Sequence, residues 1–173
     1  MKIISYANDS LNLLKKHYNK SKEGFRMEMR IDFYDKVPEA LNQMLEMEKY
    51  TKKTAIDRKL RELIKIRASQ INRCAHCLNM HARDARKMGE TEQRIYCVNA
   101  FRDCDFYTDE EKAVLELTEY VTKISECGVP DEVYDNVRKY FNEKDFSDLI
   151  FIINQINSWN RLSVSMGNFA TKE

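Results

Sequence analysis

The stretch that decides the fold reads Arg73-Cys74-Ala75-His76-Cys77-Leu78-Asn79-Met80-His81. Two of the chain's three histidines and two of its five cysteines lie within it. A helix that begins at residue 74 turns by about 100° per residue, which places Cys74, Cys77 and His81 at roughly 0°, 300° and 340° around its axis. All three then share one narrow face, where we expect the chemistry of the protein.

The side chains around Cys77 are those that a reactive thiol needs. A thiol attacks through its thiolate, and His81, one helical turn further on, can share the proton of Cys77 directly or through one water. Glu62, from the preceding helix, can orient His81 and favour its protonated form. Cys74 is close enough to attack a sulfenic acid on Cys77 and form a disulfide. These four residues predict a complete peroxide-reducing cycle.

The residues alone do not decide which cysteine attacks. The helix N-terminus and its dipole lie nearer Cys74, which favours Cys74 as the more acidic thiol. The spacing to His81 favours Cys77. Both assignments therefore stay open at the level of physical reasoning.

A zinc site is an alternative interpretation of the same residues. Cys74, Cys77 and His81, with Glu62 as a fourth group, could supply the ligands of a tetrahedral ion. The sequence lacks a second cluster of cysteine and histidine, which a structural zinc module needs to close, so we expect no metal and no cofactor. The other three cysteines (Cys97, Cys104 and Cys127) are expected to be inert core residues.

Composition predicts an all-α protein. The 173 residues are 43% hydrophobic, enough for one domain with a core, and contain only four glycines and two prolines. With 29 basic and 28 acidic residues the net charge is +1, which indicates no nucleic-acid or membrane partner. A run from Lys49 to Arg73 holds nine Lys or Arg but only two acids, and we interpret it as a solvated face that adds positive potential near the thiols.

Helical periodicity predicts a single-domain bundle of seven or eight helices. We expect residues 1–24 to form an N-terminal helical appendage and residues 25–173 to form the main domain. Within the main domain, residues 25–33 are expected to be extended. The further helices are expected at 38–51, from 57 onward, and at 74–88, 91–101, 108–127, 130–141 and 146–166. Two details of these helices can be tested: Val121 and Ile124 should point inward, and Asn154, Asn157 and Arg161 need hydrogen-bond partners if they are buried.

No targeting signal is expected. Residues 1–10 are interrupted by polar groups too early for a signal peptide, and no apolar run reaches 18 residues. Together with the odd number of cysteines, this predicts a soluble, cytoplasmic protein with reduced thiols.

The pattern Glu62, eleven residues, Cys74-Ala75-His76-Cys77, three residues, His81 resembles the core signature of the AhpD-like alkylhydroperoxidases, within the carboxymuconolactone decarboxylase superfamily. The surroundings also resemble single-domain members, over roughly residues 26–166, in Arg61-Glu62-Leu63 and in residues 67–72, 81–86 and 156–161.

The resemblance implies an all-helical fold, assembly into trimers or hexamers and thiol peroxidase activity. By matching position, Cys77 becomes the peroxide-attacking cysteine, Cys74 the resolving one, and His81 and Glu62 the proton relay. His76 matches a histidine that supports activity, although its helical angle points it away from Cys77. We therefore expect a hydroperoxide substrate and an external dithiol, lipoyl or thioredoxin-like, as reductant. A redox sensor that uses the same pair without turnover remains an alternative, whereas lactone decarboxylation is disfavoured because that branch does not need the cysteine pair.

Overall fold

The computed structural model describes residues 29–172, and this part of the chain is all-α, as predicted, with no strand among the described residues. The expected helix at the start of the chain and the division at residue 24 lie outside the described residues, and that division stays a prediction. The elements are α2 (Phe33–Lys36), α3 (Pro38–Lys52), α4 (Arg58–Ile71), α5 (Ala75–Lys87), α6 (Glu92–Tyr96), the 3₁₀ helix η1 (Val98–Asp103), α7 (Asp109–Thr122), α8 (Ile124–Cys127), α9 (Asp131–Arg138) and α10 (Glu143–Met166).

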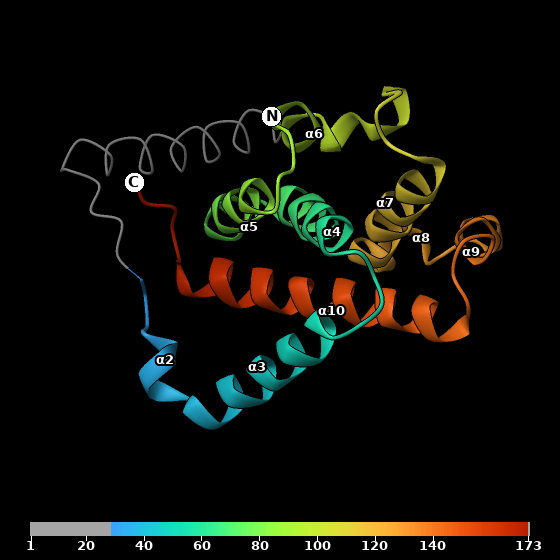
Figure 1. Cartoon of the computed structure of the whole chain (residues 1–173). Helices are drawn as coiled ribbons and strands as arrows, with labels where there is room; N and C mark the ends of the chain where they lie inside the picture. Colours follow the sequence, from blue (N-terminus) through green and yellow to red (C-terminus); the bar gives the residue numbers. More distant parts are fainter. Residues whose placement is uncertain (1–28, 173) are drawn as a thin grey trace, which may run out of the picture.

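Helix α10 is the central element of the bundle. It crosses the middle of the molecule, with α4 and α5 on one side and α3 on the other (Figure 1). Fully buried aliphatic side chains on α10, α4, α7 and α9 form the largest core cluster, which includes Leu149, Ile152, Ile64, Leu117 and Val137. No helix within residues 29–172 has the length and apolar content that a membrane crossing requires.

Short-range signals in the sequence set where the helices begin. Asp57 caps α4 by accepting from the backbone N–H groups of Lys59 and Leu60 at 2.8 and 3.1 Å. Thr108 and Glu111 form the predicted capping box of α7. Helix α10 begins at Glu143, earlier than expected, because Asn142 already accepts from the Asp145 N–H at 2.9 Å.

Two expected helices are broken, and the short helix α2 was not predicted. The described residues therefore hold nine α-helices and one 3₁₀ helix, where the sequence predicted seven or eight helices for the whole chain. The segment 91–101 divides into α6 and η1, and Ala100 inside η1 has non-helical angles (φ −118°, ψ 23°). The segment 108–127 breaks at Lys123 (φ −108°, ψ 32°), after which α8 takes a new direction. The prediction for Ile124 is therefore wrong: its side chain is 58% exposed, whereas Val121 is buried.

A ladder of amides joins α10 to the turn between α4 and α5. Asn72 donates to the side-chain oxygens of Asn157 at 2.8 Å and Asn160 at 2.9 Å. Asn157 donates in turn to Thr122 Oγ1 at 3.1 Å, and Asn160 donates to Ser69 Oγ at 3.0 Å. Buried Asn157 thus has the partners that burial demands, whereas Asn154 and Arg161 are exposed. The ladder fixes the end of α4, directly before the two cysteines.

Candidate active site

The two cysteines lie at the start of α5. Arg73 adopts a left-handed conformation (φ 55°), which ends the α4 segment and turns the chain into α5. Cys74 is the N-cap of α5, and its Sγ accepts from the Cys77 N–H at 3.4 Å. The Cα atoms of Cys74 and Cys77 are 5.4 Å apart, and the two residues form a disulfide. Both sulfur atoms therefore belong to the first turn of one helix.

A cavity of about 330 Å³ opens beside this turn, between α3, α4, α5 and α10. Cys77 lines it, whereas Cys74 packs behind Cys77 with Ala68 and Ile156. Much of the wall is apolar, and its polar part gathers ionisable side chains. The apolar lining comes from Tyr34, Leu45, Met80, Met88 and Trp159, and the ionisable lining from Glu48, Lys52, Glu62, Lys65, His76, Cys77, His81 and Asp84.

Glu62 and His81 form a buried pair on this wall. Glu62 Oε2 lies 2.7 Å from His81 Nδ1, and each residue is 6% exposed. Burial raises the pKa of Glu62, but the hydrogen bond from His81 and the charge of Lys65 outweigh it, so the pKa of this carboxyl lies below its ordinary value. An ionised carboxylate accepts, which makes Nδ1 the donor and leaves Nε2 of the imidazole as the acceptor.

Lys65 and Glu48 are part of the site, and the sequence analysis did not identify them. Lys65 is 3% exposed, so its assignment to a solvated face is wrong. Its Nζ lies 2.8 Å from Glu48 Oε1 and 3.5 Å from Glu62 Oε1. The spacing of three residues between Glu62 and Lys65 was the available signal, because such residues are neighbours on a helix.

His76 also lines the cavity, even though its helical angle differs from that of Cys77. Its Nδ1 lies 3.3 Å from the carbonyl oxygen of Phe169, which lies after the end of α10. The ring is therefore held toward the C-terminal segment, apart from the Glu62–His81 pair. The structure thus brings Cys77, His81, Glu62 and His76 to one cavity, with Cys74 bonded behind them.

The geometry does not favour the zinc interpretation. The described side chains that converge within 4.8 Å in this cavity are Glu62, His81 and Asp84, and neither cysteine belongs to the group. Each of the two carboxylates has an ammonium neighbour: Lys65 lies 3.5 Å from Glu62, and Lys87 lies 3.5 Å from Asp84. We therefore assign this group to ion pairing and hydrogen bonding rather than to metal binding.

The remaining cysteines are free thiols, but they are not all core residues. Cys97 and Cys104 are half-buried, and burial raises the pKa of the Cys104 thiol, as does the neighbouring Cys97. Cys127 is exposed at the end of α8, so its prediction as a core residue is wrong. The helix breaks at Lys123, and none of the α8 residues after this break is buried, so the inward-facing pattern of α7 does not continue to Cys127.

The sequence and the fold were compared with known proteins. The sequence profile of the carboxymuconolactone decarboxylase family matches residues 35–120. The uncharacterized protein YdfG of Bacillus subtilis (strain 168) is 56% identical over 147 residues, which cover 85% of this chain and all of YdfG.

Two solved structures share the fold to different degrees. ATU0492 of Agrobacterium tumefaciens, a protein of unknown function described as a putative antioxidant defence protein AhpD, has a TM-score of 0.82 and 34% identity, covering 84% of this chain and 100% of that chain. The debrominase Bmp8 has a TM-score of 0.70 and 19% identity, covering 79% and 74%. At that identity the likeness to Bmp8 concerns the fold alone, so the fold by itself does not select one activity.

Proposed function

The chain belongs to the carboxymuconolactone decarboxylase family, and we propose that it is a thiol-dependent hydroperoxide reductase of the AhpD-like type, active in antioxidant defence. The observation that carries the proposal is the position of Cys77. Its side chain lines a cavity together with the hydrogen-bonded Glu62–His81 pair, and Cys74 lies behind it within disulfide distance. Cys77 is only 2% exposed, so the cavity is the route by which a small peroxide would reach it. A sulfur at a cavity wall, a base and a second sulfur are the three requirements of thiol peroxidase chemistry.

The first half of the cycle oxidises Cys77. His81 Nε2 accepts the proton of the Cys77 thiol, while Glu62 holds the protonated imidazole by its Nδ1–H. The thiolate attacks one peroxide oxygen and the O–O bond breaks. The departing alkoxide takes the proton from His81 and leaves as an alcohol, or as water when the substrate is hydrogen peroxide. Cys77 is left as a sulfenic acid.

The second half restores the thiols. The sulfur of Cys74 attacks the sulfenic sulfur of Cys77, the S–O bond breaks and water leaves with the Cys74 proton. This disulfide is the oxidised state that the structure contains. An external dithiol, lipoyl or thioredoxin-like, then supplies two electrons and two protons and itself becomes a disulfide. His76, at the same cavity, supports the reaction without touching the relay.

Homo-oligomerisation, as a trimer or hexamer in the cytoplasm, is part of the proposal. The segment formed by α2 and α3 carries apolar side chains that are roughly half exposed in the single chain, at Ile31, Tyr34, Val37 and Leu45. Neighbouring copies could cover such side chains. No metal or other cofactor takes part in the proposed cycle.

Intact mass with peptide mapping tests the proposal. After treatment of the reduced protein with hydroperoxide, we expect a loss of two hydrogens and one peptide link between Cys74 and Cys77. Cys77→Ser should abolish turnover, and Cys74→Ser should accumulate a sulfenic acid that a dione reagent traps. Cys127→Ser, which changes an exposed thiol outside the cavity, is the matched control.

Multi-turnover peroxide consumption in the Cys77→Ser variant would reject the assignment. If the wild type is oxidised once, stoichiometrically, and does not cycle further with a dithiol donor, the protein is a redox sensor rather than a peroxidase.

A further inference from the structure

Lys65 is the buried cation of the cavity, and the cycle described above does not use it. We propose that Lys65 is a positioning residue, which holds and orients the Glu62 carboxylate toward His81 while Glu48 serves as its counter-ion. This inference rests on the proposed function, because it assigns to the cluster a role in that reaction.

The two oxygens of Glu62 are divided between two partners. Oε1 faces Lys65 Nζ at 3.5 Å, and Oε2 accepts from His81 Nδ1 at 2.7 Å. A carboxylate held on one oxygen cannot rotate freely, so Lys65 presents the other oxygen to the imidazole. Glu48, from α3, fixes Lys65 in turn at 2.8 Å. The side chains of Glu48, Lys65, Glu62 and His81 therefore form a continuous series of polar contacts from α3 through α4 to α5.

A proton on His81 would balance the charges of these four side chains. With both glutamates ionised, Glu48, Lys65 and Glu62 sum to one negative charge in a buried site, and a protonated His81 neutralises it. Proton transfer from Cys77 to His81 creates that state, so the cluster supports the thiolate. The ionisable groups that line the cavity with Glu62 are Tyr34 from α2, Glu48 and Lys52 from α3, Lys65 from its own helix, and His76, Cys77, His81 and Asp84 from α5. Helix α10 contributes the uncharged Trp159 and Ser163.

Removal of Lys65 alone should therefore change the protonation of the glutamates. Two carboxylates, Glu48 and Glu62, would then share a largely buried site without a cation between them, and like charges in such a site cause one of them to take a proton. A protonated Glu62 no longer holds the imidazolium. Removal of Glu48 as well should reverse this effect, because Glu62 is then the single carboxylate beside His81.

The experiment compares Lys65→Met, the double variant Lys65→Met with Glu48→Gln, and Lys65→Arg. The first readout is a titration of the glutamate carboxyls by carbon NMR, which does not depend on peroxide turnover. The second is the pH profile of kcat/KM with an organic hydroperoxide. Lys49→Met is the matched control, because it removes an exposed ion pair (Lys49 to Glu46, 2.6 Å) on α3.

In Lys65→Met we expect one glutamate to titrate well above its ordinary pKa, and the acidic limb of kcat/KM to move up by about one pH unit, which is a tenfold loss on that limb. In the double variant the glutamate titration and the position of the acidic limb should both return toward wild type. The value of kcat/KM should stay lowered, because Lys65 no longer orients the Glu62 carboxylate. Lys65→Arg should retain the wild-type profile.

The proposal would be overturned if Lys65→Met left both the glutamate titration and the pH profile of kcat/KM unchanged. It would also be overturned if these two readouts departed further from wild type in the double variant than in Lys65→Met. If Lys65→Met does not fold, the double variant carries the test, and a wild-type kcat/KM in it would refute the role of Lys65. If the carboxyl titration behaves as expected but neither the wild type nor any variant turns over peroxide, the proposed function is wrong. The inferred charge coupling between Glu48, Lys65 and Glu62 is then still supported.

Discussion

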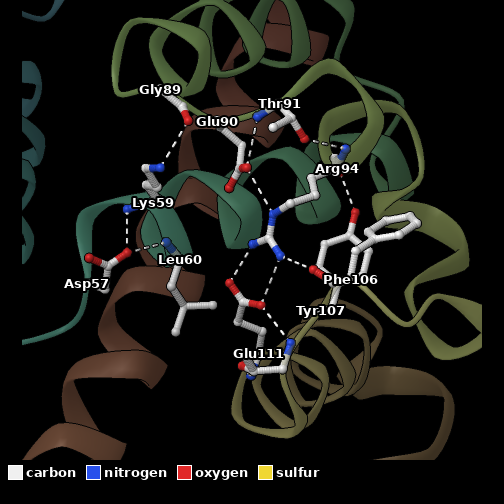
Figure 2. A network of polar contacts seen from close by, with 11 residues as sticks. Asp57, Lys59, Leu60, Gly89, Glu90, Thr91, Arg94, Phe106, Tyr107 and Glu111 are labelled. Carbon is white, nitrogen blue, oxygen red and sulfur yellow. Dashed lines mark hydrogen bonds and ion pairs between the residues drawn. The ribbon is translucent and has the colours of Figure 1, made fainter.

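Among the described residues, two clusters place a largely buried cation between two glutamates. In the cavity Lys65 lies between Glu48 and Glu62, and at the junction of α6 and α7 Arg94 lies between Glu90 and Glu111. Figure 2 shows the second cluster, in which Arg94 donates to Glu90 Oε1 at 2.9 Å and to Glu111 Oε1 at 2.5 Å. The charge pattern is the same, yet only the first cluster lines the cavity.

The Arg94 cluster connects three segments of the chain, around residues 90–94, 106–107 and 111. Arg94 also donates to the carbonyl oxygen of Phe106, and the Tyr107 hydroxyl donates to the carbonyl oxygen of Arg94 (Figure 2). Burial opposes the charge on Arg94, but the hydrogen bonds with Glu111 and Glu90 outweigh it and raise the pKa of the guanidinium above its ordinary value. Each nitrogen of the guanidinium thus donates to a carboxylate or to a backbone carbonyl, and its charge is fixed.

The Lys65 cluster differs in what it adjoins. Its second glutamate holds an imidazole, and the imidazole shares a cavity wall with a sulfur. The comparison teaches that a buried cation between two acids is not by itself a functional sign. The difference lies in the imidazole and the cavity-lining sulfur beside the Lys65 cluster, and each of the following variants tests one side of that distinction.

The largest effect is expected for His81→Gln. Without the base that accepts the Cys77 proton, kcat/KM should fall by about 10²–10⁴-fold, the usual contribution of general acid–base catalysis. His76→Gln, on the same helix and at the same cavity, should cause a smaller loss. Steady-state peroxide consumption with a dithiol donor measures both. Equal losses in the two variants would erase the distinction between the relay and the rest of the cavity wall.

The next largest effect is expected for Arg94→Met. This change leaves Glu90 and Glu111 largely buried without their cation, which should lower the free energy of unfolding by about 3 kcal/mol. The pH profile of kcat/KM, measured on the folded protein, should keep its shape because none of these residues lines the cavity. Urea unfolding measures the stability. A shifted profile in this variant would mean that the two clusters are coupled.

The smallest effect is expected for the contribution of the Glu62 carboxyl to the free energy of unfolding at acidic pH. Its pKa lies below the ordinary 4.5, so its ionised form stabilises the fold above that pH, and this contribution is lost as the pH falls through the lowered pKa. The difference in unfolding free energy between wild type and Glu62→Gln should therefore narrow between pH 7 and pH 3. Arg94 stays charged over this range. A difference that widens on acidification would contradict the sign of the shift.

Local patterns predicted much of the fold and of the candidate site. The caps at Asp57 and Thr108 lie within four residues of the groups they bind, so the sequence contains the whole interaction. The same holds for Cys74, Cys77 and His81, whose spacing brings them to one face of a helix. Glu62 is on another helix. Its place beside His81 was predicted from the groups that a reactive thiol needs, and the resemblance to a known family implied the same place.

The features that were missed depend on contacts distant in the sequence. Lys65 is one of nine cations in a run, and nothing in that run shows that it is buried or that it pairs with Glu48 of α3, 17 residues earlier in the chain. Asn160 joins the amide ladder because α10 passes the end of α4, 88 residues from Asn72 along the chain. The break at Lys123 likewise follows no strong local signal, since neither glycine nor proline stands there.

Cys74 is both the cap of a helix and half of a disulfide. In the proposed cycle, a reductant that enters the cavity would attack Cys77, which lines it, and would expel Cys74 as the leaving group. The departing sulfur would then carry its negative charge at the start of α5, where the backbone N–H groups and the helix dipole stabilise anions. The proposed regeneration would therefore have a direction, with Cys77 as the sulfur attacked and Cys74 as the thiolate released.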